Sequence, residues 1–158
     1  MIERYSEMLT DENFISESDE VFMLTDVDHY YDELARIIKN DCQRRVEWII
    51  SNPCFEIWLY HCHFDFLHDD VLALEQLEAD KRSSALKNIL DGLLPGGIDP
   101  RKSFMKLSDG IANARNTYKE DVNQIPILFS TSMYIFADRI LSLIGKNNFH
   151  KWIEARNR

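Results

Sequence analysis

The sequence predicts an α/β fold, with a small parallel sheet core and its helices followed by a mainly helical C-terminal half. Two apolar segments, residues 20–26 and 45–51, have the length and composition of strands. A short amphipathic segment joins them, and after them apolar residues recur at helical spacing. We therefore expect one domain over residues 1–158, with an α/β core at about 18–65 and a mainly helical part at about 66–158.

The strand–helix–strand unit comes first. Its first strand, EVFMLTD, is apolar nearly throughout, as is typical of a central strand that is covered on both faces. Leu34, Ile37 and Ile38 follow at spacings of three and four residues, which predicts a helix that ends near Asn40. The second strand, RVEWIIS, completes the unit, and this order of elements indicates an α/β sheet.

Helices are expected over the rest of the chain. Pro53 suits the first position of a helix that continues through CFEIWLYHCHF, because a missing N–H does no harm there. A linker at residues 93–100, LLPGGIDP, resists helix through its prolines and glycines. The later helices are expected at residues 69–80, 83–93, 102–118, 131–145 and 147–156.

The composition narrows the class of protein. A chain of 158 residues that is 45% hydrophobic can bury one core. The net charge of −9 argues against a generally basic surface that coats nucleic acid, although a metal-bridged or locally basic contact stays compatible with it. Cys42, Cys54 and Cys62 follow no secretory signal, and no segment approaches about 18 uninterrupted apolar residues. We therefore expect a soluble cytoplasmic protein with no membrane span.

Two aspartates, Asp26 and Asp28, stand at the end of the first strand. In an open α/β sheet, ligands collect beyond the carboxyl ends of the strands. Residues two apart on an extended chain point the same way, so both carboxylates are expected to reach one cation. Mg²⁺, or Mn²⁺ in its place, is the expected metal, because carboxylates, water and substrate phosphates are its usual ligands.

Helix capping explains the same aspartates without a metal. Asp28 or Asp32 would then accept hydrogen bonds from the backbone N–H groups of the following helix. Spacing alone favours this interpretation, because short acidic motifs often match by chance.

A more specific pattern follows the second strand. SNPCFEIWLYHCHF, residues 51–64, resembles the RloB-like family, and IANARNTY, residues 111–118, resembles a helix of that family. The resemblance implies a toprim-related fold, in which a glutamate and an acidic pair hold Mg²⁺ for phosphodiester chemistry. It also implies a role in phage defence and abortive infection, because RloB-like proteins are encoded beside restriction-modification and other defence genes.

The resemblance makes Asp26 and Asp28 the expected catalytic metal ligands. Together with a local concentration of basic residues, it makes Asn52, Asn113 and Arg115 the expected substrate contacts. Toprim domains place their glutamate on a strand ahead of the acidic pair, and none of the 25 residues before Asp26 shows that pattern. We therefore expect the amino-terminal strand–helix unit of the family to be missing, and activity to be weak at most.

Glu56 is the candidate third catalytic residue. The carboxyl end of the second strand should lie beside that of the first, so Glu56 is expected to face Asp26 and Asp28. A structural role is equally open, in which Ser51 or Asn52 caps the helix and Glu56 reaches back in a capping box.

Other patterns favour structural roles. Zinc binding by Cys54, His61, Cys62, His63 and His68 is disfavoured, because His61 and His63 diverge on a helix. Six aromatic residues are expected in the core rather than stacked on bases: Trp48, Phe55, Trp58, Tyr60, Phe64 and Phe66. A basic group is either a phosphate-contacting or a solvated surface: Lys81, Arg82, Arg101, Lys102, Lys106, Arg115 and Lys119. The sequence contains neither a P-loop nor a Gly-x-Ser-x-Gly motif.

Two functions follow from these observations. The first is a metal-dependent nuclease of a phage-defence system. The alternative is a non-catalytic interaction or regulatory module, in which the sheet edge left by the missing unit pairs with a second copy or a partner chain.

Overall fold

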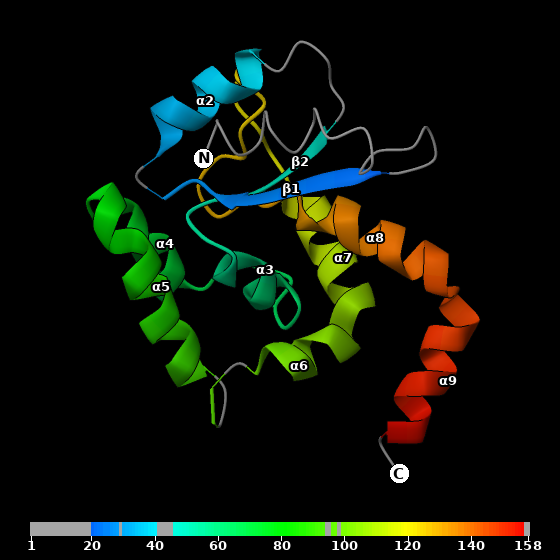
Figure 1. Ribbon diagram of the computed structural model, residues 1–158. Helices are drawn as coiled ribbons and strands as arrows, with labels where there is room; N and C mark the ends of the chain where they lie inside the picture. The colour runs from blue at the N-terminus through cyan, green and yellow to red at the C-terminus, as the bar shows by residue number, and fades with distance from the viewer. Residues whose placement is uncertain (1–19, 29, 41–45, 94–95, 98, 157–158) are drawn as a thin grey trace.

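The computed structural model describes residues 20–28, 30–40, 46–93, 96–97 and 99–156, and all that follows concerns these. Two parallel strands, β1 (Val21–Asp26) and β2 (Val46–Ser51), form the sheet. Their register runs from Val21 opposite Val46 to Asp26 opposite Ser51. Because parallel strands end at the same edge, the carboxyl ends of β1 and β2 lie together. The predicted α/β fold, with a helical C-terminal half, is confirmed (Figure 1).

Helix α2 (Tyr31–Asn40) covers one face of the sheet (Figure 1). Leu34 packs there with Ile50 of β2 and with Val27 and Ile125, and all four side chains are buried. The acidic residues in the first turn of α2 and the basic residue in its last turn suit the helix dipole.

Three helices cover the opposite face: α3 (Glu56–His61), α7 (Leu107–Thr117) and α8 (Met133–Ile144) (Figure 1). Trp58, Ile111 and Ala137, one from each helix, meet Ile49 of β2 in one buried cluster. β2 therefore has helices on both sides, which explains why its neighbours Ile49 and Ile50 are both almost fully buried. This core fixes α3 and α8 against the sheet.

The other elements extend this layer. They are α4 (Asp69–Leu72), η1 (Ala73–Gln76), α5 (Ala79–Leu93), α6 (Pro100–Ser103), η2 (Phe104–Lys106) and α9 (Lys146–Arg156). A second buried cluster joins α3 to α5 through Ile57, Tyr60 and Leu86. Helix α5 is thereby held beside the start of α3.

The prediction that β1 is covered on both faces is wrong for the described residues. β1 pairs with β2 on one side, and Leu24 is 48% exposed. β2 is the more enclosed strand, since residues 130–132 bind its free edge: Ser132 N–H donates to Ile50 O at 2.9 Å, and Asn52 N–H to Ser130 O at 3.0 Å. The same pairing makes α8 begin at Met133 instead of residue 131.

Several predicted helix limits are also wrong. The helix expected at 69–80 is broken, because Leu77 is extended between η1 and α5. The helix expected at 102–118 contains a 3₁₀ turn and starts earlier, at Pro100, where Asp99 caps it. Pro53 is not the first helical residue: the Asn52–Pro53 peptide is cis, and α3 begins at Glu56.

We expected no strand ending in glutamate ahead of Asp26, and this prediction concerns residues 1–19, which lie outside the described residues. Cys42, within residues 41–45, also lies outside them. Among the residues that the structure describes, no helix has the length and apolar character needed to cross a membrane.

Candidate functional site

The carboxyl ends of β1 and β2 form the candidate site. Beyond β1, Val27 N–H donates to Ser51 O at 2.9 Å, and Asp28 N–H donates to Pro53 O at 2.9 Å. The backbone at Val27 and Asp28 is therefore bound to the corner that follows β2. The expectation that Asp26 and Asp28 project side by side from an extended chain is wrong, because the chain turns and Asp28 takes a φ of 38°, in the left-handed region.

Glu56 is the acidic neighbour that acts most strongly on Asp26. The pKa of Asp26 is raised, first by partial burial and next by the negative charge of Glu56, while the charge of Asp28 contributes less. A hydrogen bond from the Phe55 backbone N–H opposes the rise in the pKa of Asp26. The negative charge of Glu56 therefore acts on Asp26 where β1 ends, and a bound cation would reduce the repulsion between these two carboxylates.

Lys87 of α5 partly balances this charge. Its Nζ lies 3.5 Å from Oε1 of Glu56, and the charge of Glu56 is the main cause of its raised pKa. The Lys87 side chain is about half exposed, so it is also accessible to a ligand. Cys54, by contrast, is buried, and burial raises the pKa of its thiol to about 12, which keeps it protonated and a poor nucleophile.

The corner between β2 and α3 is held by polar side chains. The Asn52 side-chain amide donates to Pro126 O at 2.8 Å, and the Ser51 hydroxyl lies 2.8 Å from Oγ1 of Thr131. The predicted capping box is wrong, because α3 has no side-chain cap and Glu56 pairs with Lys87 instead. Asn52 therefore fixes the shape of the corner.

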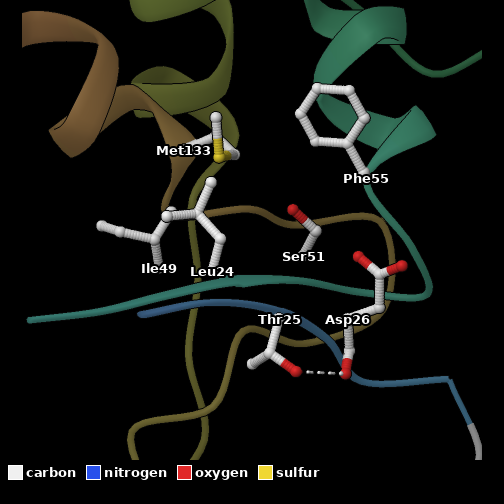
Figure 2. A pocket seen from close by; sticks show the side chains of 7 residues that line it. All are labelled: Leu24, Thr25, Asp26, Ile49, Ser51, Phe55 and Met133. Carbon is white, nitrogen blue, oxygen red and sulfur yellow. Dashed lines mark hydrogen bonds between the residues drawn. The ribbon is translucent and has the colours of Figure 1, made fainter. Parts of the chain in front are cut away.

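A pocket of about 410 Å³ opens between the end of the sheet and the first residues of α3 and α8. In Figure 2, the carboxylate of Asp26 and the hydroxyl of Ser51 point to the side of the sheet that carries Phe55 and Met133. Its walls are mostly apolar, and its lining residues are Leu24, Thr25, Asp26, Ile49, Ser51, Phe55 and Met133. Leu24 is exposed because it borders this opening.

The carboxylates at this edge are the residues that could hold a metal ion. No group of three or more His, Cys, Asp or Glu side chains within the described part of the chain is arranged to hold a metal. Asp26, with either Glu56 or Asp28, supplies two carboxylates at most. That number suffices for Mg²⁺, which commonly keeps several waters and takes other ligands from substrate phosphates.

Asn113 and Arg115, two of the expected substrate contacts, make contacts within the helical layer. The Asn113 amide donates to His61 O at 2.9 Å, at the end of α3 opposite Glu56. Arg115 pairs with Asp138 at 3.2 Å and lies over the ring of Tyr134. Both residues thus join α7 to neighbouring helices and do not line the pocket.

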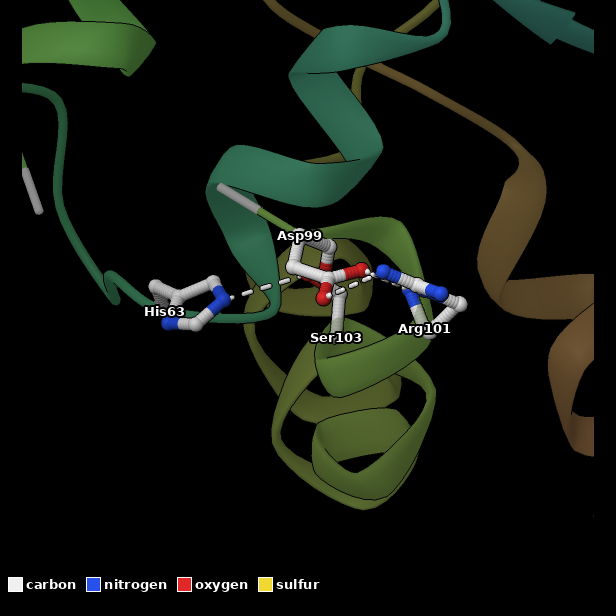
Figure 3. A network of polar contacts seen from close by, with 4 residues as sticks. All are labelled: His63, Asp99, Arg101 and Ser103. Atoms are coloured by element: carbon white, nitrogen blue, oxygen red, sulfur yellow. Dashed lines mark hydrogen bonds and ion pairs between the residues drawn. The ribbon is translucent and has the colours of Figure 1, made fainter. Parts of the chain in front are cut away.

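A second polar network lies at the far end of α3 (Figure 3). His63 Nε2 is 3.1 Å from the Ser103 hydroxyl, while Asp99 binds Arg101. Ser103 is buried and donates to Asp99 O at 3.2 Å, and the carboxylate of Asp99 binds Arg101 rather than orienting His63. This network is therefore suited to anchoring α6, and it lacks the geometry of a nucleophilic triad.

The predictions for the histidine and aromatic side chains hold where the side chain is buried and fail for two that are exposed. His61 is fully buried and lies 3.2 Å from Phe129 O, so it points away from His63, as expected. Trp58 and Tyr60 are core residues, as predicted. The same prediction is wrong for Phe55 and Phe66, which are 36% and 59% exposed because they lie in loops at the ends of α3.

Sequence reasoning missed Lys87, Thr131 and Met133 as site residues. Lys87 lies in an ordinary amphipathic helix, and no local pattern marks it. Thr131 and Met133 are about 80 residues from β2 in sequence, and only the pairing of residues 130–132 with β2 brings them to the site. A run of small hydroxyl residues, Ser130 to Ser132, was the one available signal.

Comparison with known proteins supports the resemblance seen in SNPCFEIWLYHCHF. The model of one protein family, described as RloB-like protein, matches residues 1–140. No curated protein and no solved structure matches the chain. The match spans the strands, the corner and the first part of α8, so the chain belongs to the RloB-like family.

Proposed function

We propose that this RloB-like protein is a divalent-metal-dependent nuclease that cleaves nucleic-acid phosphodiesters as part of phage defence. One observation carries the proposal: Asp26, at the end of β1, and Glu56, at the start of α3, carry carboxylates that interact beside the edge where two parallel strands end. That edge is where α/β sheets generally bind ligands. The resemblance to toprim-related proteins, in which carboxylates at strand ends hold Mg²⁺, supports the same assignment.

Asp26 and Glu56 would hold the metal, with Asp28 as the alternative to Glu56. When bound, Mg²⁺ or Mn²⁺ would neutralise the phosphate charge and favour attack by water. Lys87 would bind a phosphate oxygen when Glu56 turns to the metal, because its side chain is accessible and its ammonium lies 3.5 Å from that carboxylate. Asn52 would act as a positioning residue, since its amide holds the corner that carries Asp28 and Glu56.

Metal-dependent cleavage by the purified full chain tests the proposal. Labelled single-stranded and duplex DNA and RNA would be incubated with Mg²⁺ or Mn²⁺, and products resolved by length. We expect cleavage that chelation abolishes, and a loss of at least 100-fold in Asp26→Asn, because this change removes the charged ligand and keeps its shape. Asp32→Asn is the matched control: it makes the same change on the exposed side of α2 and should cleave normally.

The double variant Asp26→Ala/Asp28→Ala gives the sharpest negative result. If it retains normal cleavage, the acidic pair does not carry the reaction and the proposal is wrong. Titration of Mn²⁺ into the wild type and Asp26→Asn separates metal binding from catalysis, and equal affinity in the two proteins would remove Asp26 from the metal site.

A second candidate function is a non-catalytic interaction module of a defence system. It is favoured by Leu24, which is 48% exposed on a strand that has one strand partner within the described residues. Such an edge pairs readily with another strand, from a second copy or a partner chain. A concentration-independent monomer mass in light scattering, combined with metal-dependent cleavage, would exclude the homodimeric form of this function.

A further inference from the structure

We infer that the pocket beside Asp26 binds an unpaired nucleobase that carries an exocyclic amino group: adenine, cytosine or guanine. The inference rests on the proposed function and deepens it, since it names single-stranded nucleic acid, or an unstacked nucleotide, as the substrate class. The volume of the pocket, about 410 Å³, is in the range of small-ligand sites.

The shape and chemistry of the walls suit a flat aromatic group. Phe55 is 36% exposed at the pocket, where a base can stack on its ring. The Met133 thioether and the Leu24 side chain line the same space, and sulfur packs well against aromatic rings. Aromatic stacking on single-stranded nucleic acid stabilises binding for every base, because every base has a π face.

The polar groups decide what kind of flat group binds. Asp26 presents a carboxylate, which accepts hydrogen bonds and donates none when it is ionised. The Ser51 hydroxyl shares one hydrogen bond with Thr131, and whichever of the two donates, the Ser51 oxygen can still accept a bond from a ligand. A ligand that fills the pocket must therefore bring an N–H donor to Asp26, and the exocyclic amino groups of adenine, cytosine and guanine are such donors, whereas uracil has no amino group.

This requirement excludes a purely aliphatic occupant. An aliphatic side chain from another protein would cover the Leu24, Ile49 and Met133 walls but would remove water from Asp26 and supply no donor. Removing water from an ionised carboxylate whose remaining hydrogen-bond donor is the Phe55 backbone N–H is unfavourable. A nucleobase meets both needs, since its faces are apolar and its edge donates.

Location joins the pocket to the proposed reaction centre. Asp26 lines the pocket, and the charges of Glu56 and Lys87 both act on its carboxylate. A nucleotide with its base against Phe55 would thus place its phosphate near Lys87 and the candidate metal ligands. Bases inside a duplex are stacked on both faces, so the base must be unpaired or extruded to enter.

Nucleotide binding to the full chain, measured without divalent metal, tests the inference. The probes are AMP, CMP, UMP and ribose 5-phosphate, followed by saturation-transfer NMR and calorimetric titration. We expect saturation of base protons in AMP and CMP and weaker binding of UMP and ribose 5-phosphate. Equal binding of all four probes would overturn the inference, because the phosphate would then be the only recognised group.

Two variants identify the pocket as the binding place. Phe55→Ala should weaken AMP binding by roughly 5- to 150-fold, the range expected for one stacked base. Phe66→Ala is the matched control, since Phe66 is also exposed but does not line the pocket, and it should bind AMP normally. Equal effects of the two variants would refute the assignment, and circular dichroism of both would verify that they fold.

Asp26→Asn adds a test of base selection. An amide side chain offers both a donor and an acceptor, so the preference for AMP and CMP over UMP should shrink towards onefold. If the wild-type preference persists, Asp26 does not contact the base. If, instead, the chain forms a concentration-dependent dimer that Phe55→Ala abolishes, a second copy occupies the pocket and the inference is wrong.

These outcomes separate the inference from the proposed function. Base binding by a protein that cleaves nothing would leave the pocket assignment standing and refute the nuclease. Metal-dependent cleavage that is unaffected by Phe55→Ala, on single-stranded and duplex substrates alike, would support the nuclease and refute the pocket assignment.

Discussion

Replacing Gly110 with alanine tests the packing that positions α3. A Cβ atom at Gly110 would lie 2.7 Å from Sγ of Cys62 and 2.9 Å from Cη2 of Trp58, both of which are buried. Overpacking of this kind costs about 1–3 kcal/mol, and contact with two enclosed side chains places it in the upper part of that range. Alanine recovers about 1 kcal/mol through its higher helix propensity. The net loss of stability in Gly110→Ala should be about 1–2 kcal/mol.

Urea unfolding, monitored by tryptophan fluorescence, measures this loss of stability. In thermal unfolding the melting temperature should fall by roughly 2–8 °C. Gly92→Ala is the matched control, because Gly92 is also helical, in α5, and a Cβ atom added there would meet no atom within 4 Å. The control should be neutral or more stable by up to about 1 kcal/mol. If Gly110→Ala is as stable as Gly92→Ala, the close approach of α7 to α3 is wrong.

A double variant tests the contact between Gly110 and Cys62 directly. Cys62→Ala removes the sulfur that is nearest to the new methyl group, so Gly110→Ala should cost less in that background than in the wild type. The coupling free energy should be about 0.5–1.5 kcal/mol, as for residues in contact. Additive effects would show that Cys62 does not restrict this position.

Two further predictions concern buried polar groups. Tyr60→Phe should destabilise the fold by about 1–3 kcal/mol in urea unfolding. The reason is that the Tyr60 hydroxyl donates to Phe66 O and accepts from His68 N–H, both at 2.9 Å. A neutral effect would contradict these two hydrogen bonds. Burial lowers the pKa of His61 below its ordinary 6.5. Between these two pKa values His61 is therefore protonated in the unfolded chain and neutral in the folded protein. Its contribution to stability is present above pH 6.5 and is lost as the pH falls through the lowered value, with a slope of up to about 1.4 kcal/mol per pH unit. His61→Phe should reduce the fall in urea stability between pH 7 and pH 5, and an unchanged slope would contradict the burial of His61.

The order of elements could be predicted because local patterns carry it. EVFMLTD and RVEWIIS contain enough apolar and β-branched residues to specify strands, and the Asn52–Pro53 corner marks the end of the second. The carboxyl ends of two parallel strands must meet, so Asp26 and Glu56 could be placed near each other from topology. Helix limits were less accurate, since tertiary contacts decide them: residues 130–132 pair with β2, and α8 therefore starts later than predicted.

By itself, the sequence determined the α/β class, the acidic strand end and the resemblance to RloB-like proteins, because each depends on residues that are close along the chain. Tertiary structure alone decided that Glu56, more than Asp28, affects Asp26, that Lys87 balances Glu56, and that Phe55 and Met133 border a pocket with Ser51. These contacts join α3, α5 and α8 to the sheet across long sequence separations. Their geometry follows from how the helices pack, and no local pattern encodes it.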